Sequence, residues 1–397
     1  MTKTKLHLLV RADRIEVRFE HASYQLTRVI VELPALPWFS GVRIRGDDWK
    51  PFGAREIEVG DWVFDTRFFV EGPERLVVRM LDAEMRRLLL EAGSKGDLEI
   101  REGTLQVVAL DHRLPEVLPI LLELAQRFMR QSTNAAPGLA ANARRDPEPG
   151  VRLRNLIHLA RDFRDEQLTH ETLRAACRDP SPQVRLQAGT ALGAEGRDVL
   201  RELAEDAEGT IEDAISSLAV AALGAELPLE RVQAILRRSL RDRRIQTARV
   251  CLERLGRSGD TTAVPTLAKI LALEKDELAI AAAVALGITG DEAAEPPLIQ
   301  ALDRDDNGLG VAAANALAHI GSAASVLPLK EAARSGDQAL RQAARQAVAE
   351  IQSRFHPGAS PGQLSLAQAE AGQLSLATDP AGQLSLPPQE PEKGPGG

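Results

Sequence analysis

The sequence predicts an α+β domain at the amino terminus, then an all-α solenoid of repeated helical hairpins, then a disordered tail. Eleven of the thirteen aromatic residues precede residue 130, which indicates two kinds of core. An internal repeat with a period of 31 residues follows. The last segment is rich in Pro, Gly, Gln and Ala. The predicted parts are an α+β domain over 1–130, a linker over 131–150, a solenoid of about six hairpins over 151–355, and a tail over 356–397.

The amino-terminal part consists of β-branched and aromatic runs separated by turn signals. Residues 14–20 (RIEVRFE) alternate polar and apolar side chains, as a strand with one buried face does. Further strands are predicted at 27–33, 42–45, 67–70, 98–101 and 104–110. Two amphipathic helices complete this part, over 82–92 with Gly93 as its stop, and over 114–129.

The next segment, 131–150 (QSTNAAPGLAANARRDPEPG), shows no hydrophobic period. It combines Pro, Gly, Asn and small residues, a composition that disfavours regular structure. We therefore predict a linker here.

The repeats are defined by apolar anchor residues that occur every 31 or 32 positions. The anchors are Leu192, Leu223, Leu255, Leu286, Leu317 and Val348. Four residues earlier stand the small residues Ala188, Ala219, Cys251, Ala282, Ala313 and Ala344. Eight residues before the anchors stand Val184, Ile215, Thr247, Leu278, Leu309 and Leu340. Residues at these offsets lie on one face of a helix. The small residue in the middle of this face lets neighbouring helices approach closely.

A glycine follows each of the first four anchors, at Gly193, Gly224, Gly256 and Gly287. We expect the helix to end at each of these glycines. A second apolar stretch lies upstream in each unit, as in 264–271, so each unit is predicted to be a helical hairpin. Because no hairpin can bury its apolar face alone, the hairpins must stack.

The repeat unit resembles the HEAT repeat, in the short bacterial form also seen in phycobilisome-lyase-like proteins. The residues that carry the resemblance are Asp179-Pro180-Ser181-Pro182-Gln183-Val184-Arg185 and, later in the unit, Ala191-Leu192-Gly193. The resemblance covers roughly 165–353 and implies a fold, not an activity. Arg185 has a counterpart only in Arg341, so the Asp–Arg ladder that the family often has is expected to be partial. Residues 60–72 are more distantly similar to a bacterial domain of unknown function.

Composition and cysteine content restrict the class of protein. The chain is 27% charged, has a formal net charge of −8 and lacks a long apolar run, so we expect no membrane-spanning helix and no membrane partner. Its acidic balance argues against wholesale nucleic-acid binding. Only Cys177 and Cys251 are present, which argues against a disulfide framework and a thiolate metal site. The sequence thus favours a cytoplasmic protein.

No catalytic or metal-binding motif stands out. The seven histidines are dispersed, whereas a metal site needs several clustered ligands. HEAT-like enzymes that hydroxylate deoxyhypusine carry several His-Glu pairs for a di-iron centre, but this chain has only His170-Glu171. Cys251 occupies a position that is alanine in the other repeats, so we interpret it as a core residue. We predict no catalytic residue, no metal and no cofactor.

Charge along the solenoid alternates in blocks. Residues 202–230 hold eight acids and no base, 231–257 hold nine arginines against two acids, and 271–306 hold nine acids against two bases. In a solenoid these blocks become stripes, which either neutralise one another or bind an acidic protein segment or phosphates. The candidate partner-binding residues of the basic stripe are Arg237, Arg238, Arg241, Arg243, Arg244 and Arg249.

The tail contains Gly-Gln-Leu-Ser-Leu three times, every ten residues. The repeat is similar to the bacterial sliding-clamp-binding peptide, but Ala367, Ala377 and Pro387 stand where an aromatic residue should follow. It is either a multivalent linear motif or low-complexity drift. The candidate motif residues are Gln363, Leu364, Leu366, Gln373, Leu374, Leu376, Gln383, Leu384 and Leu386.

These observations favour a non-enzymatic scaffold or adaptor that binds a protein or peptide partner through the solenoid. The second helix of each unit is expected to offer the binding face, with Thr190, Ala221, Glu253, Val284, Asn315 and Gln346 on it. One alternative is an enzyme, or an enzyme accessory, with a pocket in the amino-terminal domain. Another is nucleic-acid binding through the Arg231–Arg257 stripe. Neither the partner nor the oligomeric state follows from the sequence.

Overall fold

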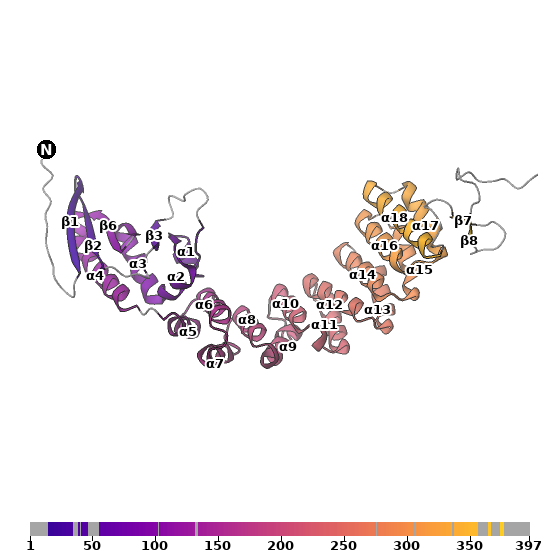
Figure 1. The fold of residues 1–397 in the computed structure, drawn as a ribbon, viewed down its shortest axis with the longest axis horizontal. Coiled ribbons are helices and arrows are strands. Elements are labelled where there is room, and N and C mark those ends of the chain that lie inside the picture. Colours follow the sequence, from indigo (N-terminus) through magenta and orange to yellow (C-terminus); the bar gives the residue numbers. More distant parts are fainter. Residues whose placement is uncertain are drawn as a thin grey trace, which may run out of the picture. The chain divides into compact units, whose positions relative to one another are not determined.

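A computed structural model describes residues 15–34, 39, 41–46, 55–101, 103–131, 134–274, 276–304, 306–335, 337–355, 364–366 and 374–376 (Figure 1). Contacts divide the chain into two compact units, Met1–Leu203 and Ala204–Gly397, which we describe separately.

The first unit begins with an antiparallel sheet of six strands in the order β1-β2-β6-β5-β3-β4. The strands are β1 (Glu16–Ser23), β2 (Leu26–Glu32), β3 (Arg43–Gly46), β4 (Phe68–Glu71), β5 (Gly96–Arg101) and β6 (Thr104–Leu110). All six lie within a few residues of the strands that the alternating pattern predicts. In the β2–β6 pair, Val31 lies opposite Leu105 and Val29 opposite Val107, and all four side chains are buried.

The remaining elements of the first unit are helices. They are α1 (Trp62–Asp65), α2 (Glu74–Met80), α3 (Ala83–Lys95), α4 (Leu114–Arg130), α5 (Ala136–Arg145), α6 (Pro149–Asp162), α7 (Gln167–Ala176) and α8 (Pro182–Leu192). The helices α3 and α4 contact β5, β6 and β2. The other sheet face carries ion pairs such as Arg18–Glu32 and Arg28–Glu20, as expected for an antiparallel sheet with one polar face.

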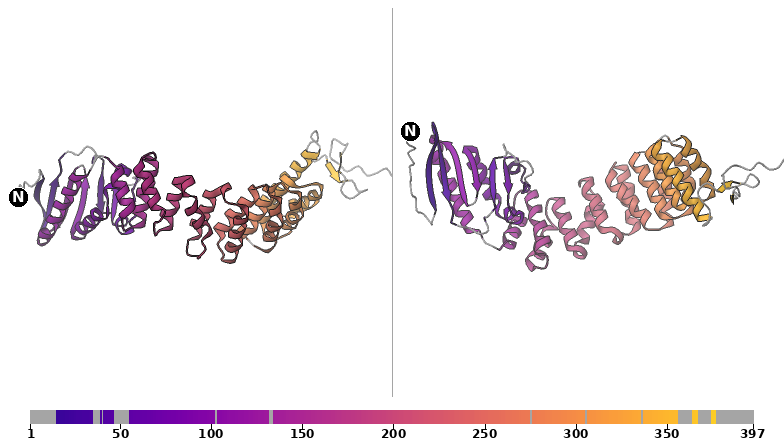
Figure 2. Two further views of the ribbon diagram at one scale, coloured as in Figure 1. Left: turned by 90° about the horizontal axis from the view of Figure 1, so that it is seen from below. Right: turned by 45° about the horizontal axis from the view of Figure 1, so that its top comes forward.

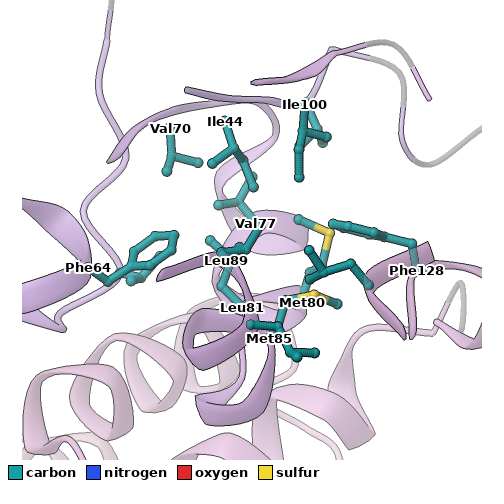
Figure 3. Close-up of a cluster of buried hydrophobic side chains, with 14 of the residues drawn as sticks. Ile44, Phe64, Val70, Val77, Met80, Leu81, Met85, Leu89, Ile100 and Phe128 are labelled. Atoms are coloured by element: carbon teal, nitrogen blue, oxygen red, sulfur yellow. The ribbon is translucent and has the colours of Figure 1, made fainter. Parts of the chain in front are cut away.

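The core of this unit lies between the sheet and α2, α3 and α4. Figure 3 shows Ile44, Val70 and Ile100 of the sheet above Val77 and the other apolar side chains of α2 and α3. Gly93 is not the stop that the sequence predicts. The helix α3 continues past it to Lys95, and the ring of Phe68 would lie 2.7 Å from a Cβ at position 93. Glycine here makes room for an aromatic ring.

The predicted linker over 131–150 is wrong for most of its length. Residues Ala136–Arg145 form the helix α5, which buries Leu139 and packs against α6, α7 and α2. Its small residues and Pro137 fit a tightly packed helix start, and a Cβ at Gly138 would lie 2.7 Å from Cγ of Arg79. The sequence also holds a missed signal, because Asp146-Pro-x-Pro-x-Val-Arg152 recurs 33 residues later at Asp179–Arg185.

Buried polar side chains tie the sheet domain to these helices. The guanidinium of Arg86 donates to Asp61 at 2.7 Å and, through two nitrogens, to Asp146 at 2.9 Å. Arg152 makes the equivalent two-pronged bond to Asp179, at 2.7 and 2.8 Å. An Asp–Arg ladder therefore exists in the first unit and begins within the predicted linker.

The second unit is a two-layer stack of helical hairpins (Figure 2). Its helices are α10 (Asp213–Leu223), α11 (Leu229–Arg241), α12 (Ile245–Arg257), α13 (Val264–Leu273), α14 (Asp276–Thr289), α15 (Glu295–Leu302), α16 (Asn307–Ile320), α17 (Ala323–Ser335) and α18 (Gln338–Phe355). The unit boundary falls within α9 (Arg197–Glu205). One layer contains α10, α12, α14, α16 and α18, and each of these helices packs on the next. The other layer contains α11, α13, α15 and α17.

The repeat positions lie where the sequence predicts. The small residues from Ala188 to Ala344 are all fully buried, and so are the anchors Leu255, Leu286 and Leu317. Of the predicted binding-face positions, Glu253 is half-buried and the other five are exposed. Short 3-10 turns connect elements at η2 (Asp111–Arg113), η3 (Gly193–Gly196), η4 (Gly224–Glu226), η5 (Thr261–Ala263) and η6 (Glu292–Ala294).

Two of the four helix-end predictions need correction. Gly193 and Gly224 do follow the ends of α8 and α10, with positive φ values of 59° and 49°. In contrast, Gly256 and Gly287 lie inside α12 and α14. A Cβ on either glycine would come within 2.8 Å of Cα of an alanine in the next helix of the layer. These two glycines allow close helix packing.

Most of the predicted tail lies outside the described residues, including Gln363, Gln373, Gln383, Leu384 and Leu386. Within the tail the structure describes two short strands, β7 (Leu364–Leu366) and β8 (Leu374–Leu376), which pair antiparallel. Two of the three Leu-Ser-Leu copies thus pair with each other in the backbone.

Candidate functional site

The predicted basic stripe does not form one continuous surface. Arg244 is only 13% exposed and binds Asp206, the carbonyl of Ile211 at 2.6 Å and the hydroxyl of Ser216 at 3.1 Å. The half-buried Arg238 donates to the carbonyls of Glu205 and Asp206. Both side chains thus bind groups of the preceding helices and of the segment that connects them, which gives Arg238 and Arg244 a structural role within the unit.

Two further arginines of the stripe, one at the end of α11 and one in the loop that follows it, are exposed but paired. Arg241 donates to Asp242 at 3.1 Å, and Arg243 lies 3.5 Å from Glu274. Across the unit, acids of the preceding block also receive basic partners, as in the 2.7 Å bond from Arg231 to Glu205. Neighbouring charge blocks thus neutralise one another at several points.

Arg237 and Arg249 remain exposed, and neither makes an ion pair or a side-chain hydrogen bond with a described residue. They lie on different helix layers, Arg237 on α11 and Arg249 on α12. Each lines a separate groove. We therefore consider these two grooves as the candidate sites.

The first groove, which we call the inner groove, lies between α12 and α14 and has a volume of about 470 Å³. Its α12 wall carries Arg249, Glu253 and Arg257, and the last two form an ion pair at 2.6 Å. Its α14 wall carries Ile280, Val284 and Ile288 at the same three repeat positions. Val284 and Ile288 are 45% and 46% exposed, so the α14 wall is an aliphatic row open to solvent.

The second groove, which we call the outer groove, lies between α11 and α13 and has a volume of about 430 Å³. Leu236, Leu240 and Ile270 line it, and Leu273 at its end is 68% exposed. Arg237 on α11 and Lys269 on α13 are exposed along it. A neighbouring hollow of about 700 Å³ shares Leu273 and Glu274 with the outer groove, and its wall includes the ion-paired Arg243.

The sequence missed part of both grooves. The sequence predicts position 284 as a face residue, but it does not single out Ile280, Ile288, Lys269 or Leu273. Alignment of the repeats holds the signal for the inner groove, because Ile280, Val284 and Ile288 correspond to Arg249, Glu253 and Arg257 one repeat earlier. No comparable pattern marks Leu273.

The other candidate residues do not assemble into a chemical site. Cys251 is fully buried, and burial raises the pKa of its thiol to about 12, so it is a poor nucleophile. Burial also raises the pKa of Cys177. Among the described residues, no group of three or more His, Cys, Asp or Glu side chains is arranged to hold a metal ion.

A pocket does exist in the amino-terminal domain, as the enzyme alternative requires. It runs along α4, has a volume of about 660 Å³ and is lined by Pro119, Leu122, Glu123, Gln126, Arg127, Arg130 and Gln131. Arg127 lies 3.8 Å from both Glu123 and Asp82. The residues that line this pocket do not include a nucleophile placed next to a general base.

Comparison with known proteins agrees with the repeat architecture. A family model described as HEAT repeats matches residues 229–312 and 274–349, and these residues are HEAT repeats. No curated protein matches the chain. In the part of the chain that the structure describes, no helix combines the length and the apolar character needed to cross a membrane.

Two similar solved structures have low sequence identity. One is human deoxyhypusine hydroxylase in complex with glycerol, with 18% identity over 55% of this chain and 96% of that chain, and a TM-score of 0.25. The other is an engineered protein, with 18% identity over 70% of this chain and 78% of that chain, and a TM-score of 0.34.

Proposed function

We propose that the protein is a non-enzymatic cytoplasmic scaffold that binds a segment of a partner protein in the inner groove. The observation that carries this proposal is the aliphatic row Ile280, Val284 and Ile288, in which Val284 and Ile288 are about half exposed. These side chains recur every four residues, so they lie along one side of α14. An aliphatic row beside a polar wall is the type of surface that accepts an amphipathic segment.

The surrounding repeats support the choice of this groove. The positions equivalent to Val284 carry Thr190 in α8, Ala221 in α10, Glu253 in α12, Asn315 in α16 and Gln346 in α18. Only α14 carries a large aliphatic side chain at this position. Val284 is not needed to stack the hairpins, because polar or small residues stand at this position in the other repeats. Exposed apolar patches commonly mark sites of partner contact, so we assign Val284 that role.

A photocrosslinking experiment tests this proposal in native cells. A photoreactive residue is placed at position 284, and a matched one at position 327 of α17, where Leu327 is also about half exposed. We expect a discrete crosslinked protein at 284 and not at 327. Introducing Glu at position 288 as well should remove this product.

The expected loss is large enough to measure. Covering two half-exposed aliphatic side chains contributes about 2 kcal/mol, or about thirtyfold in affinity. The proposal fails if positions 284 and 327 give the same products, or if Ile288→Glu leaves the product at 284 unchanged.

A further inference from the structure

The outer groove is another place in this unit where an apolar side chain faces solvent. In the layer that contains α11, the helices α13 and α15 pack together, and so do α15 and α17. Between α11 and α13 the layer instead holds a groove lined by both helices. Leu273, in the last turn of α13, is 68% exposed beside this groove. The fold therefore leaves an apolar surface open on this side of the hairpins.

The charges along the outer groove that lack an ion-pair partner have one sign. Arg237 and Lys269 are both exposed, and neither has an acidic partner among the described residues. The acid in the lining, Glu274, is 3.5 Å from Arg243 and is thus already paired. The groove combines an apolar floor with a net positive rim, although the chain as a whole carries a formal charge of −8.

We propose that the outer groove binds an acidic amphipathic segment of a second partner protein. Aliphatic side chains of that segment cover Leu240 and Leu273 above the buried Leu236 and Ile270, and its carboxylates face Arg237 and Lys269. The inference goes beyond the proposed function, because the two grooves lie on different helix layers and use different residues. A scaffold with both sites joins two partners.

The occupant is inferred from charge complementarity. A basic segment would place like charges beside Arg237 and Lys269, which is unfavourable at a partly apolar surface. A neutral segment would leave both cations without counterions after the groove is covered. Among the described residues that line the groove, Glu274 is the single acid, and it is paired with Arg243.

The test is a selection of short peptides of random sequence on the full-length protein, with a parallel selection on Leu273→Glu. Peptides that are enriched on the first and lost on the second are ligands of the outer groove. We expect these ligands to combine aliphatic residues with Asp or Glu. Because Leu273 is mostly exposed, its substitution should leave the circular dichroism spectrum and the melting temperature unchanged.

Binding of a selected peptide is then measured on single variants. Arg237→Gln and Lys269→Gln should each weaken it about fivefold, the size of one exposed ion pair, and added salt should reduce this difference. Arg345→Gln and Leu327→Glu are the matched controls, since both residues are exposed on other helices. Val284→Glu is the control for the inner groove, and it should not change this binding.

Three results would overturn the inference. In the first, the ligands of the outer groove are neutral or basic, or Arg237→Gln and Lys269→Gln have no effect. In the second, ligands appear only after residues 356–397 are removed, which would make the chain's own tail the occupant. In the third, no peptide depends on Leu273. None of these results affects the crosslinking test at position 284, so the two proposals fail separately.

Discussion

At the scale of single residues, glycine has two different tasks at one repeat position. Gly193 and Gly224 have positive φ and follow the end of a helix, where a side chain would strain the backbone. Gly256 and Gly287 lie inside helices, and there the next helix occupies the space of a Cβ. All four repeats have glycine at this position, so the two structural roles can be distinguished only from the packing around each glycine.

Gly287→Ala tests the packing role. Alanine favours a helix over glycine by about 1 kcal/mol, so helix propensity alone predicts stabilisation. A Cβ at 287 would instead lie 2.7 Å from Cβ of Ala316, and overpacking costs about 1–3 kcal/mol. We expect a net loss of stability in urea unfolding. Val284→Ala, on the exposed side of the same helix, is the control, and a stabilised Gly287→Ala protein would contradict the packing role.

Arg241 and Arg244 show that neighbours in one basic run can have opposite roles. Arg244 is 13% exposed and holds Asp206, whereas Arg241 is 73% exposed and contacts only Asp242 among the residues described. Arg244→Gln should lower the free energy of unfolding by about 2–4 kcal/mol, because it leaves a buried carboxylate without its cation. Arg241→Gln should change it by less than about 0.5 kcal/mol. Equal effects in chemical denaturation would refute this distinction.

At the scale of elements, the sequence predicts strands and repeat helices well because their hydrophobic periods are strong. The strand β6 begins and ends where the pattern over 104–110 does, and the helix α4 differs from its prediction by one residue. The short helices α1 and α2 were missed, since four to seven residues hold too little of a helical period. The helix α5 was missed because its small residues suit both a loop and a tightly packed helix.

The candidate grooves were less predictable than the helices that form them. Charge blocks can be counted from the sequence, and they point to Arg237 and Arg249, which are exposed in the structure. The sequence does not show that Arg238 and Arg244 turn inward to carbonyls and to Asp206. Nor does it show that Leu273 is left exposed, because that depends on the space between α11 and α13.

The helix α6 carries a buried titratable side chain, His158. His158 is buried, lies 3.7 Å from Glu74 of α2 and 3.8 Å from Asp162, and its Nδ1 is 2.9 Å from Arg161. Burial lowers its pKa below the ordinary value of 6.5, and this outweighs the opposite effect of the two carboxylates. Folding therefore favours the neutral imidazole.

This sign predicts acid sensitivity of the first unit. Below about pH 6.5 the unfolded chain protonates His158 while the folded chain does not, so stability falls as the pH drops toward the lowered pKa. His158→Gln should flatten the dependence of unfolding free energy on pH between about 7 and 5. His112→Gln, at an exposed position, should keep the wild-type slope. The same slope in all three proteins would contradict the assignment.

At the scale of the whole molecule, the chain holds two compact units with a natural probe in each. All three tryptophans precede residue 63, so intrinsic fluorescence reports on the first unit. Cys251 is buried in the second unit with its thiol pKa raised to about 12, so a thiol reagent reaches it only after the surrounding repeats open. Cys177 is partly exposed in the first unit, and Cys177→Ser removes its signal.

We expect the two units to unfold as separate cooperative blocks, since among the described residues the buried cluster that contains the sheet core ends at Ala188. In a Cys177→Ser background, Arg86→Ala removes the buried cation between Asp61 and Asp146 and should move the tryptophan transition to lower urea. It should leave the urea dependence of Cys251 labelling unchanged. Arg244→Gln should have the reverse effect, with earlier labelling and an unchanged fluorescence transition. If either substitution moves both transitions together, the chain unfolds as one block, because destabilising one unit then destabilises the other.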